Sequence, residues 1–83
     1  MFLHLGGEVT IPQKEILGIF DYKIAKRSPV SKEFLDLART DKLLVEIAGP
    51  ENIKSFIITD NKIFFSPISS TTLQKRALTF LQE

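Results

Sequence analysis

The chain has 83 residues, no cysteine and one histidine, and its formal net charge at pH 7 is +1. This length fits one domain over residues 1–83 with a small core, and the lack of cysteine excludes disulfide bonds and cysteine-ligated zinc as stabilising features. The near-neutral charge lacks the strong basic excess of a monomeric nucleic-acid-binding domain. Self-association remains as a way to cover apolar surface, so we expect a homo-oligomer.

The sequence predicts no contact with a membrane. Its apolar runs are a few residues long, whereas about 20 are needed to span a bilayer. The first residues, Met1–Gly7, lack the basic start and the long apolar stretch of a signal peptide. The absence of cysteine fits a reducing compartment, and we therefore expect a cytoplasmic protein.

A β-hairpin is predicted at the N-terminus, where two short apolar segments flank Gly6-Gly7. This glycine pair can supply the positive φ angles of a two-residue turn. In the expected register His4 faces Val9 on an otherwise apolar face, which predicts a core histidine. A metal site is not expected there, since the chain has no second histidine and no cysteine. Pro12 ends the second strand because it has no N–H to donate.

The segment Glu15–Tyr22 has features of both a helix and a strand. Apolar residues recur at helical spacing, but the short apolar run Ile16–Phe20 is also typical of a strand. Gly18 within this run would weaken a helix by about 1 kcal/mol. We predict a strand that is buried on both faces.

A helix is predicted to begin at Ser28-Pro29. Ser28 can cap the helix, and Pro29 can take the first helical position, where its missing N–H costs nothing. The apolar residues that follow at i, i+4, i+7 and i+8 are predicted to form one core-facing stripe. These residues are Val30, Phe34, Leu37 and Ala38.

A strand at Leu43–Ile47 and a Gly-Pro loop are followed by a second hairpin, with Asp60-Asn61 as its turn. One face of this hairpin is wholly apolar and is predicted to face the core. The opposite face is mixed and contains Ile57 and Phe64. We expect it to be covered by a helix of the same chain or by a neighbouring subunit, and these two residues are therefore the predicted oligomer interface.

The last predicted helix follows a Ser/Thr cluster, with Ser70 or Thr71 as its cap and Thr71 and Gln74 as a capping box. Its apolar stripe consists of Leu73, Ala77, Phe80 and Leu81. All elements together predict an α+β domain with a mainly antiparallel β-sheet and two α-helices.

No set of residues predicts catalysis, a metal or a cofactor. The hydroxyls at 69–72 have no base nearby in the sequence, so helix capping explains them better than nucleophilic chemistry. Gly6-Gly7 is not followed by the Lys-Ser/Thr of a phosphate-binding loop. We do not expect an enzyme.

The basic residues form small clusters along the sequence. In a monomer they would be ordinary solvated side chains. In a ring of subunits each cluster would be repeated along one rim and could neutralise several phosphates at once. The candidate nucleic-acid-binding residues are Lys14, Lys23, Lys26, Arg27 and Lys54.

An ordered set of segments resembles a family of small bacterial regulators. The segments are Leu-His-Leu-Gly-Gly at 3–7, Val-Thr-Ile-Pro at 9–12, Ile-Leu-Gly-Ile-Phe-Asp at 16–21, Ser-Lys-Glu-Phe-Leu at 31–35, Lys-Ser-Phe-Ile-Ile-Thr-Asp at 54–60 and Ser-Pro-Ile-Ser-Ser-Thr-Thr-Leu at 66–73. They are similar to the RemA/RemB family of extracellular matrix regulators. The resemblance implies a cytoplasmic protein linked to biofilm matrix gene expression, a closed ring of subunits and binding to double-stranded DNA.

The resemblance also implies DNA-contacting arginines just after the first hairpin and in the loop before the second. In this chain those positions fall on Glu15, Glu51 and Asn52. The nearest cations are Lys14 and Lys54. Lysine cannot form the bidentate hydrogen bonds that arginine makes with phosphate or guanine.

Two hypotheses follow. In the first, the chain is a matrix regulator that forms a ring and binds DNA through its repeated lysines and arginine. In the second, it is an oligomeric interaction module that does not bind DNA and acts through a protein partner, such as the paralogous regulator.

Overall fold

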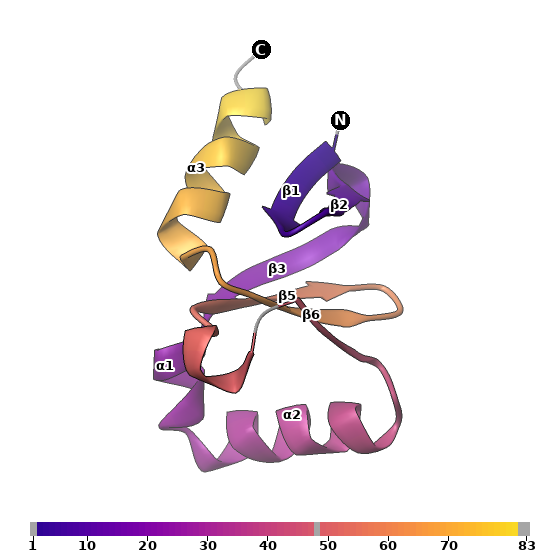
Figure 1. The fold of residues 1–83 in the computed structure, drawn as a ribbon, viewed down its shortest axis with the longest axis vertical. Coiled ribbons are helices and arrows are strands. Elements are labelled where there is room, and N and C mark those ends of the chain that lie inside the picture. The colour runs from indigo at the N-terminus through magenta and orange to yellow at the C-terminus, as the bar shows by residue number, and fades with distance from the viewer. Residues whose placement is uncertain (1, 48, 82–83) are drawn as a thin grey trace.

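The computed structural model describes residues 2–47 and 49–81, with side-chain burial described as far as Ala77. The described residues form two sheets and three α-helices (Figure 1). The strands are β1 (Phe2–Gly6), β2 (Val9–Pro12), β3 (Ile16–Asp21), β4 (Leu44–Glu46), β5 (Ser55–Thr59) and β6 (Ile63–Ser66). The helices are α1 (Tyr22–Lys26), α2 (Pro29–Thr40) and α3 (Ser70–Leu81), with 3-10 turns η1 (Gln13–Glu15) and η2 (Pro50–Asn52).

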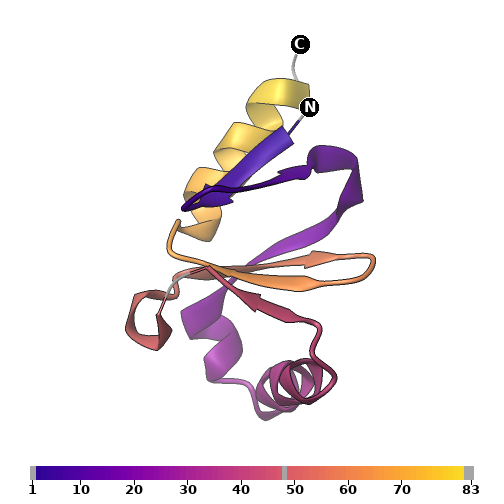
Figure 2. The ribbon, with the colours of Figure 1, turned by 45° about the vertical axis from the view of Figure 1, so that its right-hand side comes forward.

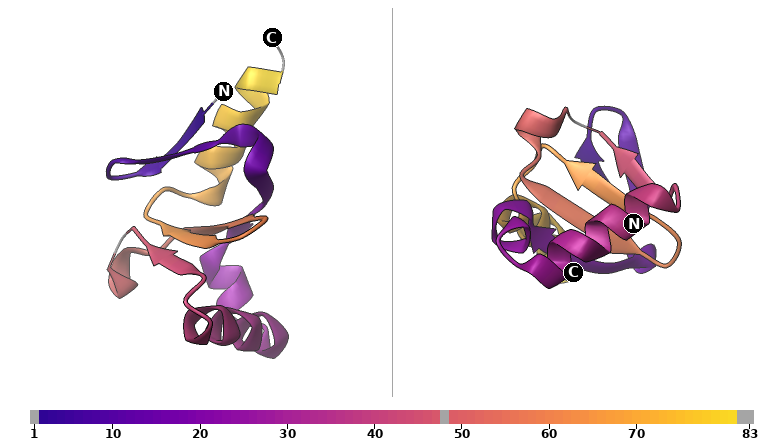
Figure 3. Two further views of the ribbon diagram at one scale, coloured as in Figure 1. Left: turned by 90° about the vertical axis from the view of Figure 1, so that its right-hand side faces the viewer. Right: turned by 90° about the horizontal axis from the view of Figure 1, so that it is seen from below.

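The central sheet has the strand order β3-β5-β6-β4. Helices α1 and α2 lie on one of its faces, and the β1–β2 hairpin and α3 lie on the other (Figures 1 and 2). Seen from below, α2 runs across the sheet (Figure 3, right). No helix among the described residues has the length and apolar content needed to cross a membrane.

The α+β class is confirmed, with two corrections. The central sheet is mixed, because β4 runs parallel to β6 while the other ladders are antiparallel. The described residues also form three helices where two were predicted, because Asp21 caps a short extra helix at α1. Its Oδ1 accepts the N–H of Ile24 at 3.0 Å.

The second hairpin has the predicted register. Ile57 pairs with Phe64 and Phe56 with Phe65, and the N–H of Thr59 donates to the carbonyl of Lys62 at 2.9 Å. Alternating apolar residues and a two-residue turn leave a single register that buries the apolar face, which is why the sequence predicts it well.

The mixed face of this hairpin is covered by the same chain. Ile57 is 0% exposed and Phe64 is 9% exposed. Both pack in a core cluster with Leu3, Leu5, Ile11 and Leu73. The prediction that Ile57 and Phe64 form an oligomer interface is therefore wrong for their side chains, because the first hairpin and α3 already bury them. Of the two alternatives for this face, cover by the same chain is correct.

The first hairpin has a different register from the predicted one. His4 pairs with Thr10 and Gly6 with Val9, with a bulge between His4 and Gly6. In this register Leu3, Leu5 and Ile11 are buried and pack against Ile57 and Phe64 of the central sheet. The prediction of a core histidine is therefore wrong: His4 is exposed, and its Nε2 lies 2.8 Å from the carbonyl oxygen of Gly7.

The strand β3 is confirmed, but it is not buried on both faces. It is an edge strand of the central sheet, and Leu17 is 70% exposed. The other side chain that it exposes strongly is Phe20.

Helix α2 begins as predicted, with Ser28 as its cap and Pro29 in its first turn. Its predicted core-facing stripe is wrong in part. Leu35 and Ala38 are buried, whereas the stripe residues Val30, Phe34 and Leu37 are exposed at 77%, 46% and 58%. The apolar arc of the helix is wider than the sheet of one chain can cover, so one side of it stays in contact with solvent.

Helix α3 is capped one residue earlier than predicted. The Oγ of Ser69 accepts the N–H of Thr72 at 3.2 Å, so neither Ser70 nor Thr71 takes that role. Leu73 is fully buried, as the predicted stripe requires. Two further members of that stripe, Phe80 and Leu81, lie outside the described side chains.

Candidate nucleic-acid interface

The three cations before α2 lie on one short, exposed helical segment. Capping by Asp21 sets the direction of α1, and the segment ends where the N–H of Arg27 donates to Ile24 O at 3.2 Å. Lys23, Lys26 and Arg27 are all exposed on it. The cluster predicted from the sequence is thus a real surface feature of the fold.

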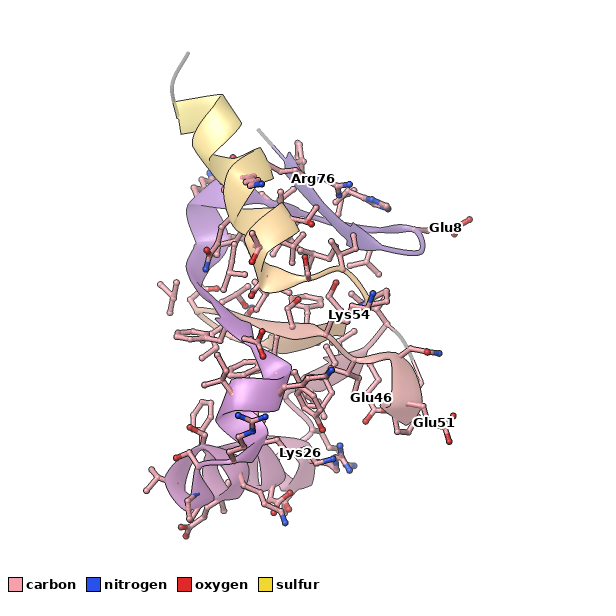
Figure 4. All side chains as sticks on the ribbon, turned by 90° about the vertical axis from the view of Figure 1, so that its left-hand side faces the viewer. Glu8, Lys26, Glu46, Glu51, Lys54 and Arg76 are labelled. Atoms are coloured by element: carbon pink, nitrogen blue, oxygen red, sulfur yellow. The ribbon has the colours of Figure 1, made fainter. Side chains whose placement is uncertain are left out.

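Lys54 is brought to the start of this helix by backbone hydrogen bonds. Its carbonyl oxygen accepts the N–H of Tyr22 at 3.1 Å, and its own N–H donates to Ser66 O at 2.9 Å. Its side chain is exposed. Lys26 and Lys54 are visible on the same side of the molecule (Figure 4). The fold therefore places the backbone of Lys54 at the start of α1, which the sequence alone could not predict.

Lys14 lies elsewhere. It lies in η1, which precedes β3, close to the pair Ile16–Thr59. Helix α1 follows the opposite end of β3, close to the pair Asp21–Ser55. The six residues of β3 separate the two sites by roughly 20 Å. One chain therefore does not gather all five predicted cations into one patch.

The positions to which the resemblance assigns DNA-contacting arginines carry acidic or amide side chains in this fold. Glu15 is half-buried in η1, next to Lys14 in the sequence. Glu51 and Asn52 are exposed in η2, close in the sequence to Lys54. A phosphate at either place would meet a carboxylate as well as a lysine, and the carboxylate opposes binding.

None of the candidate cations forms an ion pair with another residue that the structure describes. Among the residues that the structure describes, the one ion pair within 4.0 Å joins Arg39 to Glu46 at 3.2 Å, on the surface. None of the five predicted cations takes part in this ion pair. Their charges remain available to a phosphate or to a carboxylate of another molecule.

An open groove of about 520 Å³ lies beside the α1 cations but does not suit an anion. Its one charged lining residue among those described is Asp21, which already serves as the cap of α1. The rest of its lining is apolar or uncharged and polar. Within the described part of the chain, no group of three or more His, Cys, Asp or Glu side chains could hold a metal ion.

The sequence reasoning missed one group of surface residues. Ile24 on α1 is 69% exposed, and the outer side of α2 exposes the apolar stripe described above. Helical spacing identified these positions, but only the packing of the chain could show that they face solvent.

Comparison with known proteins gives a consistent result. Residues 2–77 match the family model RemA-like, described as extracellular matrix regulatory protein A-like. The chain is also similar to the extracellular matrix regulatory protein B of Bacillus subtilis (strain 168). The two are 40% identical over 77 residues, which cover 93% of this chain and 90% of that protein.

Proposed function

Because this chain belongs to the RemA-like family of extracellular matrix regulatory proteins, we propose that it regulates the expression of matrix genes of the biofilm. The observation that carries the proposal is the 40% identity over nearly the full length of both chains. The proposed role is that of a cytoplasmic regulator and is not enzymatic. Deleting the gene and measuring matrix gene transcripts tests it, and unchanged transcripts would contradict it.

The regulator acts as a homo-oligomer in this proposal. Among the residues whose side-chain burial is described, eight large hydrophobic side chains are exposed. This is more apolar surface than scattered single residues usually leave on a small monomer. A closed ring of identical subunits would cover such surface and repeat each cation around one rim. A native mass equal to one chain at micromolar concentration would contradict this part.

Double-stranded DNA is the proposed ligand, and Lys54 and Lys14 are its proposed contacts. Both are exposed lysines close in the sequence to the family positions at Glu15 and Glu51. One lysine contributes little, but a rim that repeats both would neutralise many phosphates. The α1 cations are the remaining candidates, and their unpaired charges suit either a phosphate or a protein carboxylate.

The contacts are tested by charge reversal. Lys14→Glu with Lys54→Glu should weaken binding of duplex DNA by the intact oligomer. The matched control is Lys32→Glu with Lys62→Glu, which makes the same change in net charge at two other exposed lysines. An equal loss in both pairs would mean that overall charge, and not these positions, governs binding.

The second candidate function is an oligomeric module that acts through another protein. The acidic and amide side chains at Glu15, Glu51 and Asn52 favour it, because they replace the cations that the family resemblance implies. Affinity capture with the paralogous regulator as the first partner tests it. Absence of DNA binding even at low salt, together with capture of that partner, would favour this function over the first.

A further inference from the structure

The outer side of α2 carries apolar side chains that the described part of the chain leaves exposed. We define the α2 stripe as Val30, Phe34 and Leu37, which are 77%, 46% and 58% exposed. Their spacing of four and three residues places them on one side of the helix over two turns. This surface is contiguous, unlike a single exposed apolar residue, and contiguous apolar surface marks an interaction site.

Carboxylates border the α2 stripe. Glu33 and Asp36 are exposed and flank it on the side away from the buried Leu35 and Ala38, as the 100° turn per residue requires. Asp41 follows the helix as its C-cap and is exposed at the end of the stripe. None of the three is in an ion pair within the described residues. The partner of this surface should therefore be apolar at its centre and basic at its edge.

The same chain presents a surface of that kind on α1. Ile24 is 69% exposed, and Lys23, Lys26 and Arg27 surround it in the sequence, all of them exposed. We call these four residues the α1 knob. The three cations are not paired with the three carboxylates inside one chain. The two surfaces are complementary in charge and in apolar content, yet they do not satisfy each other within a monomer.

We propose that the α1 knob of one copy docks on the α2 stripe of a second copy. This inference rests on the proposed homo-oligomer and assigns its interface. Ile24 covers part of the stripe, and the three cations face the carboxylates at its border. A second copy is the fitting occupant because every chain carries both complementary halves.

The contact has two consequences. Since the knob and the stripe are different surfaces, the contact is heterologous, and each copy uses its knob on one neighbour and its stripe on the other. Such a contact closes into a ring or continues as a filament. The α1 cations then bind protein, which leaves Lys14 and Lys54 as the phosphate contacts.

Complementary charge reversals test the contact. The knob variant is Lys23→Glu, Lys26→Glu and Arg27→Glu, and the stripe variant is Glu33→Lys, Asp36→Lys and Asp41→Lys. Each variant alone brings like charges together and should have the native mass of one chain. An equimolar mixture should regain the assembly as an alternating array, because the reversed knob faces the reversed stripe and the original knob faces the original stripe.

Native mass spectrometry and light scattering without DNA provide the readout, so the result does not depend on whether the protein binds DNA. A knob variant that still assembles alone would overturn the proposal. So would two monomeric variants that fail to assemble on mixing. A stripe variant that still assembles alone, or a mixture that forms only dimers, would likewise contradict a heterologous contact.

Single apolar substitutions keep the test valid if a triple variant loses its fold. Ile24→Ser and Leu37→Ser change exposed side chains, so circular dichroism should remain unchanged. Each should weaken self-association by about tenfold or more, because a partner no longer covers an aliphatic group. Leu17→Ser is the control, since Leu17 is 70% exposed and lies outside both surfaces. An equal loss at Leu17, or no loss at Ile24 and Leu37, would overturn the proposal.

Discussion

The hydroxyl of Ser66 donates a hydrogen bond to the carbonyl oxygen of Leu5, which joins β6 to the first hairpin. Ser66 is fully buried, and its Oγ also accepts the N–H of Ile68 at 3.0 Å. Its backbone carbonyl accepts the N–H of Lys54. One residue thus connects the hairpin that covers Ile57 to the segment that carries a proposed DNA contact.

Replacing Ser66 with Ala should lower the free energy of unfolding by about 1–3 kcal/mol, because the change removes the donor to the buried Leu5 carbonyl and the acceptor of the half-buried Ile68 N–H. Urea unfolding at fixed protein concentration measures it. Ser31→Ala is the control, because the Ser31 backbone N–H, and not its side chain, bonds to the cap Ser28. Equal losses in the two variants would contradict the assigned role of the Ser66 hydroxyl.

Gly18 leaves room for the ring of Phe20, which lies over it. A Cβ at Gly18 would be 2.5 Å from Cε2 of Phe20, and that ring stacks on Phe56 with a centroid distance of 5.2 Å. Gly18→Ala should displace the ring and cost about 1–3 kcal/mol. The cost should shrink when Phe20→Ala is already present, and a double-mutant cycle measures the difference. Purely additive losses would mean that the glycine serves the backbone alone.

Asp21 sets the direction of α1 through its side chain. Asp21→Ala should cost about 1 kcal/mol by removal of the cap, whereas Asp21→Asn should retain most of it because the amide oxygen can also accept the Ile24 N–H. The alanine variant should also weaken self-association if the α1 knob is an interface. Thermal unfolding and native mass measure the two effects, and an intact assembly in the alanine variant would speak against the interface.

The second hairpin illustrates what local sequence can predict. Its alternation of apolar residues and its Asp60-Asn61 turn permit one register that buries Phe56 and Phe65, so the pairing could be derived without the rest of the chain. The first hairpin lacks such a constraint. Gly6-Gly7 allows more than one turn, and the contact of Gly6 with Pro67 is invisible in the local sequence: a Cβ at Gly6 would lie 2.9 Å from Cδ of Pro67.

The candidate site depended even more on tertiary structure. Spacing alone found the apolar positions of α2, but the packing of Leu35 and Ala38 on the sheet decided that Phe34 and Leu37 face outward. The sequence left open whether the same chain or a neighbouring subunit covers Ile57, and the fold assigns this cover to the first hairpin and α3. The hydrogen bond from Tyr22 that places Lys54 beside α1 could not be predicted at all. Residue types predicted the kinds of surface, and long-range packing decided which residues form them.

Binding of duplex DNA by the intact oligomer over a salt series tests the proposed function most directly. We predict tight binding at low salt that falls steeply as salt rises, by about 0.9 log unit in affinity per log unit of salt for each phosphate neutralised. The oligomer should keep its native mass across the series, so that loss of binding is not loss of assembly. No binding at low salt by an intact oligomer would contradict DNA recognition and leave the protein-partner function in its place.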